Sequence, residues 1–300
     1  MTKRLRVGTR SSRLARTQTD LVIAQLTKVA PGTVFEVVPV VTSGDRDRSL
    51  GSSPDFTDAI DRALVRGDVD LAVHSAKDLP LVLGRKLELV ACPRRADPRD
   101  CLVTADSSFR LPRGARVGSS SLRRRAQLLR WRRDLNVVEV RGNVDTRIGL
   151  VRTRSVDAVV LAVAGIARLG RKSEVARILP VTKFVPSPAQ GALAVVARAG
   201  DERVRRVVSR IDHPATHACV TAERSFAAAM GGDCKVPLGA LATQRHRGLS
   251  LVGEILAPNG RTSVRRRRRG AVNCAEALGK QLAEEMRAAG ALALLSSPRR

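Results

Sequence analysis

In this sequence, the residues whose type and spacing best fit a binding site are arginines that follow predicted strands. They are Arg10, Arg123, Arg124, Arg141, Arg147 and Arg168. In open α/β sheets, ligands bind beyond the carboxyl ends of the strands, where helix N-termini add free N–H groups. A guanidinium can bind a carboxylate through two parallel hydrogen bonds. The repeated context predicts a cleft for several carboxylates or phosphates, although any single arginine could instead form a surface ion pair.

Two further residues could do chemistry of another kind. Asp78 lies just past an expected buried strand, in HSAKDLP, where its carboxylate could stabilise a substrate cation or pass a proton. It could equally cap a helix or turn. Cys234 lies in the glycine-bounded loop GGDCKVP, beside Lys235, which favours a thiolate. A reactive or modified thiol and an inert one both stay open from this pattern alone.

The other cysteines carry no such signal. They are Cys92, Cys101, Cys219 and Cys274, with wide spacing and no CxxC pair. We therefore expect neither a disulfide framework nor a metal site, and interpret them as small buried apolar residues.

The charge balance favours anionic partners. The chain has 54 Lys+Arg against 28 Asp+Glu, a formal net charge of +26. Nucleic acid is one such partner, but aromatic residues make up only 2% and tyrosine is absent, so bases have little to stack on. The arginine run at residues 265–269 is the best nucleic-acid signal, and it also fits a solvated strand or loop face.

Two features of the sequence indicate where in the cell the protein is located. No stretch reaches the eighteen apolar residues of a membrane-spanning helix. The N-terminus has basic residues but no apolar segment behind them, so a secretory signal is not expected. Both observations favour a soluble, cytoplasmic protein.

The elements that must position these residues alternate between strands and helices. Expected strands cover residues 5–8, 34–42, 69–74, 87–92, 116–118, 137–140 and 158–163, and expected helices end near 26, 65, 133 and 152, with another near 166. Such repetition predicts parallel sheets covered by helices. Residues 93–99, PRRADPR, are interpreted as a crossing between domains.

The pattern changes after residue 214. A helix at 215–229, strands at 238–242 and 249–256, and an amphipathic helix at 274–289 predict a smaller α+β domain.

Taken together, the segments around these residues resemble the porphobilinogen deaminase (hydroxymethylbilane synthase) family. The resemblance runs in order along nearly the whole chain. Its segments are GTRSSRLA (8–15), TSGD (42–45), DLAVHSAKDLP (70–80), DPRD (97–100), VGSSSLRR (117–124), VRGNVDTR (140–147), LAVAGIARLG (161–170), AQGALAV (189–195), TAERSF (221–226) and GDCKVPLGA (232–240).

The resemblance implies an activity. Members of this family join four porphobilinogen molecules head to tail, with loss of ammonia at each step, to give hydroxymethylbilane for tetrapyrrole (haem) biosynthesis. They carry a dipyrromethane cofactor, made from the same substrate and linked by a thioether to a cysteine. Each added pyrrole brings two carboxylates, which is the chemistry that the arginines predict.

The resemblance also implies roles for residues. Cys234 matches the cysteine that holds the cofactor, and Asp78 matches a catalytic aspartate that stabilises positive charge on the pyrroles. Gln190 matches a hinge and cleft position, and Phe56 matches an aromatic residue over the pyrroles. Residues that match carboxylate-binding positions are Arg10, Ser12, Lys77, Ser119, Ser121, Arg123, Arg124, Arg141, Arg147 and Arg168.

The implied fold has two periplasmic-binding-protein-like (type II) domains with mostly parallel sheets and a small α+β C-terminal domain. The expected domains are residues 1–94 with 194–212, 95–193, and 213–300, the last bearing the cofactor cysteine. We expect a monomer that acts on a small molecule, porphobilinogen, without a membrane or nucleic-acid partner.

One segment departs from the family pattern. The loop after TSGD is shorter than usual and reads GSSPD at 51–55, with Ser53 and Ala59 at positions where other residues are expected. This departure motivates an alternative, a diverged paralogue that binds pyrroles or other polycarboxylates with altered or no turnover. A nucleic-acid-binding protein is the remaining hypothesis, motivated by charge alone.

Overall fold

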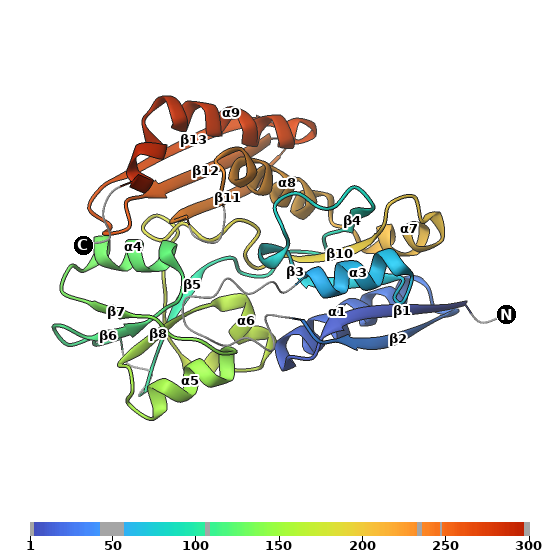
Figure 1. Cartoon of the computed structure of the whole chain (residues 1–300), viewed down its shortest axis with the longest axis horizontal. Helices are drawn as coiled ribbons and strands as arrows, with labels where there is room; N and C mark the ends of the chain where they lie inside the picture. Colours follow the sequence, from blue (N-terminus) through green and yellow to red (C-terminus); the bar gives the residue numbers. More distant parts are fainter. Residues whose placement is uncertain (1–2, 43–56, 106–108, 233–235, 247, 297–300) are drawn as a thin grey trace. The chain divides into compact units, whose positions relative to one another are not determined.

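The computed structural model describes residues 3–42, 57–105, 109–232, 236–246 and 248–296 (Figure 1). The chain divides into two compact units. Unit 1 comprises Met1–Ala96 and Gly191–His217, and unit 2 comprises Asp97–Gln190 and Ala218–Arg300.

Unit 1 is built on a five-stranded sheet. Its strands are β1 (Lys3–Arg10), β2 (Thr33–Val40), β3 (Leu71–Ser75), β4 (Leu87–Ala91) and β10 (Leu193–Arg198). The strand order is β2-β1-β3-β10-β4, and β1 is parallel to both β2 and β3. Strand β10 runs antiparallel between β3 and β4. The carboxyl ends of β1 and β3 therefore reach the same edge of the sheet.

Helices cover both faces of this sheet. They are α1 (Arg13–Val29), α3 (Asp58–Arg66) and α7 (Glu202–Val208), with short 3-10 helices η1 (Ala76–Asp78) and η3 (Ser209–Ile211). Helices α1 and α7 share one hydrophobic core with β1 and β3, in which Leu5, Leu26 and Val204 are fully buried. Helix α3 packs on the opposite face, where Ile60 approaches Gly8.

Unit 2 contains a sheet with the same arrangement. Its strands are β5 (Asp100–Thr104), β6 (Arg116–Gly118), β7 (Asn136–Val138), β8 (Ala158–Ala162) and β9 (Val175–Ile178). The order is β7-β6-β8-β5-β9, and β5 is the antiparallel strand between β8 and β9. In both sheets the inserted antiparallel strand closely follows a point where the chain passes from one unit to the other.

Three α-helices and one 3-10 helix surround this second sheet. They are α4 (Leu122–Trp131), α5 (Val144–Arg152), α6 (Val163–Arg168) and η2 (Lys172–Glu174). Helices α5 and α6 share a core with one face through Ile148 and Ile166, and α4 packs on the other face through Leu128. Alternate residues of β8 supply both cores, as expected for a strand buried on two sides.

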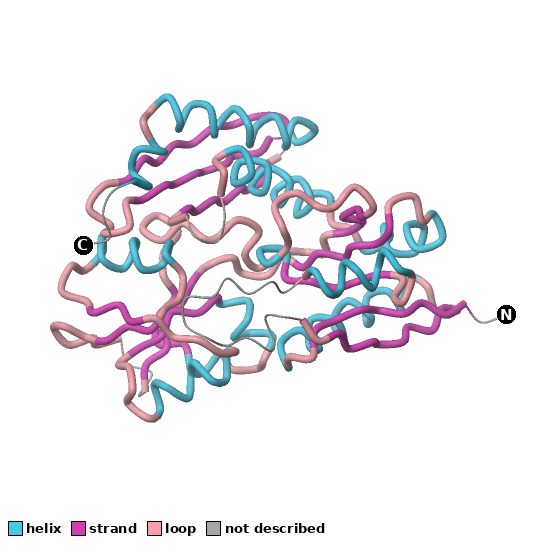
Figure 2. The backbone as a smooth tube through the Cα atoms, in the orientation of Figure 1, coloured by secondary structure: helices cyan, strands magenta, loops and turns pink. Residues whose placement is uncertain are grey.

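The rest of unit 2 is an antiparallel sheet with helices on one face (Figure 2). Its elements are α8 (Pro214–Ala229, which begins in unit 1), β11 (Leu238–Arg245), β12 (Gly248–Leu256), β13 (Ser263–Ala271), η4 (Val272–Cys274), α9 (Ala275–Ala288) and η5 (Ala291–Ser296). The strand order is β11-β12-β13. Gly253 of β12 has no side chain because Phe226 of α8 and Met286 of α9 fill the space above it.

The predicted fold class is confirmed: two mostly parallel sheets covered by helices precede a small α+β part. The prediction omitted β5, β9, β10 and α7; of these, β5, β9 and α7 are short and begin beside polar or charged residues. It left the arginine run at 265–269 open between a strand and a loop face, and this run lies in β13. Three buried cysteines, Cys92, Cys101 and Cys219, occupy core positions as expected, whereas Cys274 at the end of η4 is exposed, so its interpretation as a buried residue is wrong. The three-domain division stays a prediction. Among the described residues, no helix is long and apolar enough to cross a membrane.

Candidate functional site

A small pocket lies at the edge of the unit 1 sheet where β1 and β3 end. Its volume is about 50 Å³, and its polar lining residues are Arg10, Ser12, Gln18, Thr57, His74, Ser75 and Asp78. Arg10 is the last residue of β1, and Asp78 ends η1, which follows β3 directly. Parallel pairing of Val7 with Leu71 and of Gly8 with Ala72 fixes the register that brings these ends together.

Helix α1 begins at this pocket. Ser12 is its N-cap, and the Ser12 hydroxyl accepts a hydrogen bond from the Ala15 N–H at 3.3 Å. The positive end of the α1 dipole therefore lies at this pocket, where it favours an anion. Gln18, one turn further, exchanges hydrogen bonds with Ser75 at the end of β3, with Nε2 2.9 Å from the Ser75 Oγ. A cation, a helix start and hydroxyl groups thus share one pocket.

Asp78 presents its carboxylate at the surface of this pocket. It is exposed, whereas Lys77 beside it is half-buried and is not among the lining residues. The structure therefore brings together Arg10, Ser12 and Asp78 of the predicted set.

His74 is a lining residue that the sequence analysis missed. The side chain is 4% exposed, and its Nε2 atom has no hydrogen-bond partner among the residues that the structure describes. Burial, followed by the charge of Arg10, lowers the pKa of His74 to about 4. The ring is therefore neutral near pH 7. A polar residue at the end of the apolar strand segment VDLAVH was the available signal.

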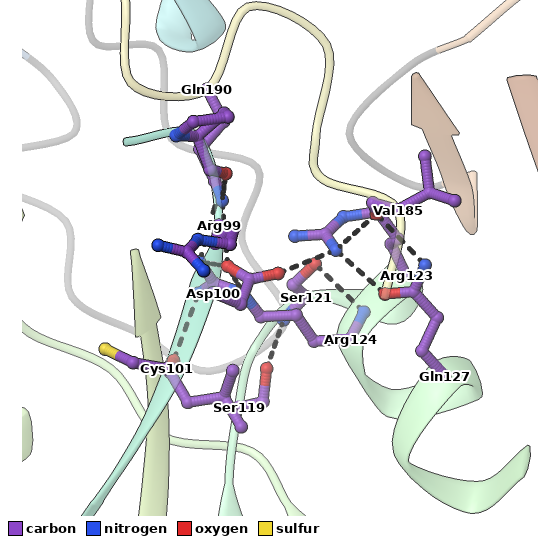
Figure 3. A network of polar contacts seen from close by, with 12 residues as sticks. Arg99, Asp100, Cys101, Ser119, Ser121, Arg123, Arg124, Gln127, Val185 and Gln190 are labelled. Carbon is purple, nitrogen blue, oxygen red and sulfur yellow. Dashed lines mark hydrogen bonds and ion pairs between the residues drawn. The ribbon is translucent and has the colours of Figure 1, made fainter. Parts of the chain in front are cut away.

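Unit 2 contains a buried cluster centred on Asp100 (Figure 3). Arg123 Nη1 donates to Asp100 Oδ2 at 2.9 Å, and Arg124 Nη2 donates to Asp100 Oδ1 at 2.7 Å. All three side chains are less than 10% exposed. Burial alone would raise the pKa of Asp100, but the two guanidinium groups hold it far below its usual value. Burial lowers the pKa of Arg123, yet a guanidinium keeps its proton at any physiological pH.

Two glutamines extend this cluster. Gln190 Nε2 donates to Asp100 Oδ1 at 2.9 Å and to the Pro98 carbonyl at 2.7 Å. Gln127 accepts from Arg123 Nη1 at 2.8 Å and donates to Glu254 Oε2 at 2.9 Å. Glu254, on β12, is fully buried and also pairs with Arg130 at 2.8 Å. The cluster therefore connects β5 and α4 to the antiparallel sheet.

The start of α4 lies beside these arginines. Ser121 is its N-cap and accepts from the Arg124 N–H at 3.4 Å, while the buried Ser119 accepts from the Ser121 N–H at 3.3 Å. Arg147, in the first turn of α5, donates to the Gly142 carbonyl and to Ser120. The structure thus groups Ser119, Ser121, Arg123, Arg124 and Gln190 closely.

Two predicted arginines have other surroundings. Arg141 pairs with Glu139 at 3.0 Å, and both are partly exposed. Arg168 ends α6, and burial lowers its pKa to about 10. Cys234 and Phe56 lie outside the described residues.

These side chains suit a ligand with several carboxylates. Within the cluster, two buried arginines share the single carboxylate of Asp100, so positive charge is in excess. Within the described part of the chain, the buried Arg123 Nε atom has no hydrogen-bond partner, although such a donor normally has one. The desolvated Arg168 would also gain from a nearby anion. Asp100, Gln127 and Glu254 were not predicted as site residues; the signals for Asp100 were its place in the segment DPRD and the acidic start of the apolar run DCLVT.

Two family models match this chain. "Porphobilinogen deaminase, dipyromethane cofactor binding domain" matches residues 5–206, and "Porphobilinogen deaminase, C-terminal domain" matches residues 217–288. The chain belongs to the porphobilinogen deaminase family. The first porphobilinogen deaminase model contains both the Asp78 pocket and the Asp100 cluster, and the second contains Cys234.

Relatives of this family match over 94–100% of their own length. A porphobilinogen deaminase of Roseiflexus castenholzii is 46% identical over 99% of this chain and 100% of its own length. One of Geotalea daltonii is 40% identical over 98% of this chain and 94% of its own length. Porphobilinogen deaminase 1 of Streptomyces coelicolor is 43% identical over 98% of both chains.

Solved structures with similar folds include periplasmic binding proteins. One from Salmonella typhimurium with high arginine specificity shares 11% identity over 70% of this chain and 91% of its own, with a TM-score of 0.41. A TRAP periplasmic solute binding protein from Desulfovibrio salexigens shares 10% identity over 71% of this chain and 73% of its own, with a TM-score of 0.43.

Proposed function

We propose that this chain is an active porphobilinogen deaminase, a transferase also called hydroxymethylbilane synthase. It would join four porphobilinogen molecules stepwise into hydroxymethylbilane and release ammonia, in the biosynthesis of tetrapyrroles and haem. The observation that carries this proposal is the match to relatives of that name over the whole length of both chains, at 46% identity. The diverged-paralogue alternative is not favoured, because this match covers the entire relative.

The proposed cofactor is dipyrromethane, joined by a thioether to Cys234. When bound, it supplies the pyrrole end to which new units are added. The candidates to hold its carboxylates are Ser119, Ser121, Arg123, Arg124, Arg141, Arg147, Arg168 and Gln190. The excess positive charge around Asp100 and the buried Nε of Arg123 support this assignment. In this cluster Asp100 would orient the two guanidinium groups, because both donate to it.

For the substrate, we assign the Asp78 pocket. Arg10, Ser12 and the first turn of α1 would bind carboxylates, together with Lys77, and Phe56 would lie over the pyrroles. Asp78 would stabilise positive charge on the pyrrole as ammonia leaves the substrate. A carboxylate held beside a developing cation stabilises the transition state and so lowers the barrier. The neutral His74 adds no charge to compete with Asp78.

The same proposal includes the organisation of the molecule. Residues 1–94 with 194–212 would form the domain with the catalytic aspartate, 95–193 the domain with the cofactor arginines, and 213–300 the domain with the cofactor cysteine. We further propose a cytoplasmic monomer whose activity needs no nucleic acid.

Replacement of the Asp78 charge tests the mechanism. In Asp78→Asn, we expect the rate of bilane formation from porphobilinogen to fall by about 10² to 10³, because the stabilising charge is lost. The matched control is Asp20→Asn, an exposed aspartate on α1, which should keep the wild-type rate. An Asp78→Asn enzyme with unchanged turnover would remove Asp78 from the mechanism. A wild-type protein without turnover would contradict the proposed function.

A further inference from the structure

Strand β13 forms a long outer edge of the antiparallel sheet. It pairs with β12 through 9 consecutive residues, from Ser263 to Ala271, without a register shift. It contains no proline. Among the described residues, no strand pairs with its outer side, and its main chain forms no hydrogen bond to a backbone group outside β12. Apart from the Arg265 carbonyl, which accepts from the Arg266 Nη1 at 3.1 Å, its outward N–H and C=O groups are therefore available for pairing.

The opposite edge of the same sheet, strand β11, forms hydrogen bonds with other parts of unit 2. In β11, the Ala240 N–H donates to the Pro186 carbonyl at 2.9 Å, and the Ala242 N–H donates to Glu223 Oε1 at 2.7 Å. Both acceptors belong to unit 2. The contrast singles out β13 as the edge that could receive another strand.

The arginine run of this protein lies on β13. Arg265 donates to the Thr182 carbonyl at 2.6 Å, and Arg268 pairs with Glu285 of α9. Arg266, Arg267 and Arg269 are exposed, and none of them forms an ion pair with a described residue. Two arginines therefore stabilise the unit, and three carry uncompensated charge along its edge.

Natural sheets protect their edges with short strands, prolines, bulges or charges. This edge is long, regular and free of proline, so within the described part of the chain the charge of its arginines is the protection that remains. A second copy of the chain would place arginine against arginine and be repelled. An acidic strand would not be repelled. Repulsion of basic strands therefore makes the edge specific for an acidic partner.

We propose that β13 is a docking edge for an extended acidic segment of a partner protein, which adds to the sheet as a further strand. Arg267 and Arg269 lie on one face, about 7 Å apart, because side chains alternate along a strand. Acidic residues at alternate positions of the added strand would lie opposite them. The partner backbone would pair with the outward groups of β13.

Other anionic partners fit this edge less well. The large exposed hydrophobic residues of the described chain all lie outside β11, β12 and β13, so this sheet offers no anchor for a membrane. Nucleic acid could use the charge but not the free backbone groups, and the chain has few aromatic residues for base stacking. An acidic polypeptide uses both features. This inference does not depend on the proposed function.

Fluorescence anisotropy with a labelled nine-residue peptide of alternating glutamate and threonine tests the proposal. We expect saturable binding to the full-length protein at about 0.15 M salt. The double variant Arg267→Glu/Arg269→Glu should weaken binding at least about tenfold, since two attractive pairs become repulsive. The control Arg110→Glu/Arg113→Glu changes two exposed arginines outside any strand by the same total charge. It should weaken binding by less than about threefold.

Two further probes separate a strand from a general polyanion. A peptide N-methylated at every residue has the same charge but lacks amide donors, so it should bind at least about tenfold more weakly. Hydrogen exchange of the wild-type amides in residues 263–271 should slow when the original peptide binds. Three results would each overturn the proposal: no binding of the original peptide, equal binding of the N-methylated peptide, or equal binding of a single-stranded DNA oligonucleotide of the same charge. Equal losses in the two arginine variants would do so as well.

Discussion

Buried charge is concentrated at Asp100, where one carboxylate faces two guanidinium groups in the interior of unit 2. Removal of one partner from such a group leaves the others buried without compensation, which costs far more than loss of a surface pair. The cluster therefore supports the structure as well as the proposed ligand site.

The variant Asp100→Asn tests that view. We expect the free energy of unfolding to fall by about 3–5 kcal/mol, because Arg123 and Arg124 stay charged and buried. The control Asp97→Asn removes a carboxylate whose pair with Arg99 is partly exposed, and it should cost no more than about 1 kcal/mol. Urea unfolding of the two variants measures both values, and equal losses would contradict the account.

His74 makes a prediction about pH. Its pKa is about 4 in the folded chain against an ordinary value of 6.5, so the folded state binds fewer protons than the unfolded state. Stability from this group is complete above about pH 6.5 and is lost as the pH falls towards 4, by about 3 kcal/mol in total.

The variant His74→Asn should therefore lose less stability than the wild type between pH 7 and about pH 4.5. The exposed His246 provides the control, since His246→Asn keeps a residue that tolerates its positive φ of 52°. Urea unfolding across this pH range gives the comparison. The same pH dependence in His74→Asn and wild type would show that His74 is not buried neutral.

At the scale of elements, two glycines of unit 2 make opposite predictions. A Cβ on Gly118, in β6, would lie 2.9 Å from Val140 and 3.1 Å from Val159, so Gly118→Ala should destabilise by about 1–3 kcal/mol. A Cβ on Gly149, within α5, would contact nothing within 4 Å, so Gly149→Ala should stabilise by up to about 1 kcal/mol. Thermal unfolding midpoints should shift in opposite directions; a shared direction would contradict the packing described for β6.

Long apolar segments were predictable from sequence, and inserted strands were not. Strand β3 and helix α9 appear within two residues of their expected ends, because their periodicity is unbroken. Strand β5 starts at a buried aspartate beside a charged crossing, and its stability depends on Arg123 and Arg124 from distant sequence. No local sequence pattern indicates a contact between residues so far apart in the chain.

At the scale of the whole molecule, the arginines that give the excess of positive charge lie in several different places. Some surround the proposed carboxylate sites at Arg10 and at the Asp100 cluster, and others lie along the exposed edge of β13. Which arginines lie near a candidate ligand site was predictable, because those arginines follow strand ends. Which of them are ion-paired in the interior depended on tertiary contacts, as for Arg124 and Asp100. Assignment to porphobilinogen deaminase rested on ordered motifs, which no single arginine could supply.

The mass of the intact purified protein tests the central claim most directly. A porphobilinogen deaminase should carry a gain equal to two linked pyrrole units, which disappears in Cys234→Ala and persists in the control Cys274→Ala. The control replaces an exposed cysteine outside the proposed site. An unmodified wild-type mass that persists after incubation with porphobilinogen would contradict the proposed cofactor, and with it the proposed function.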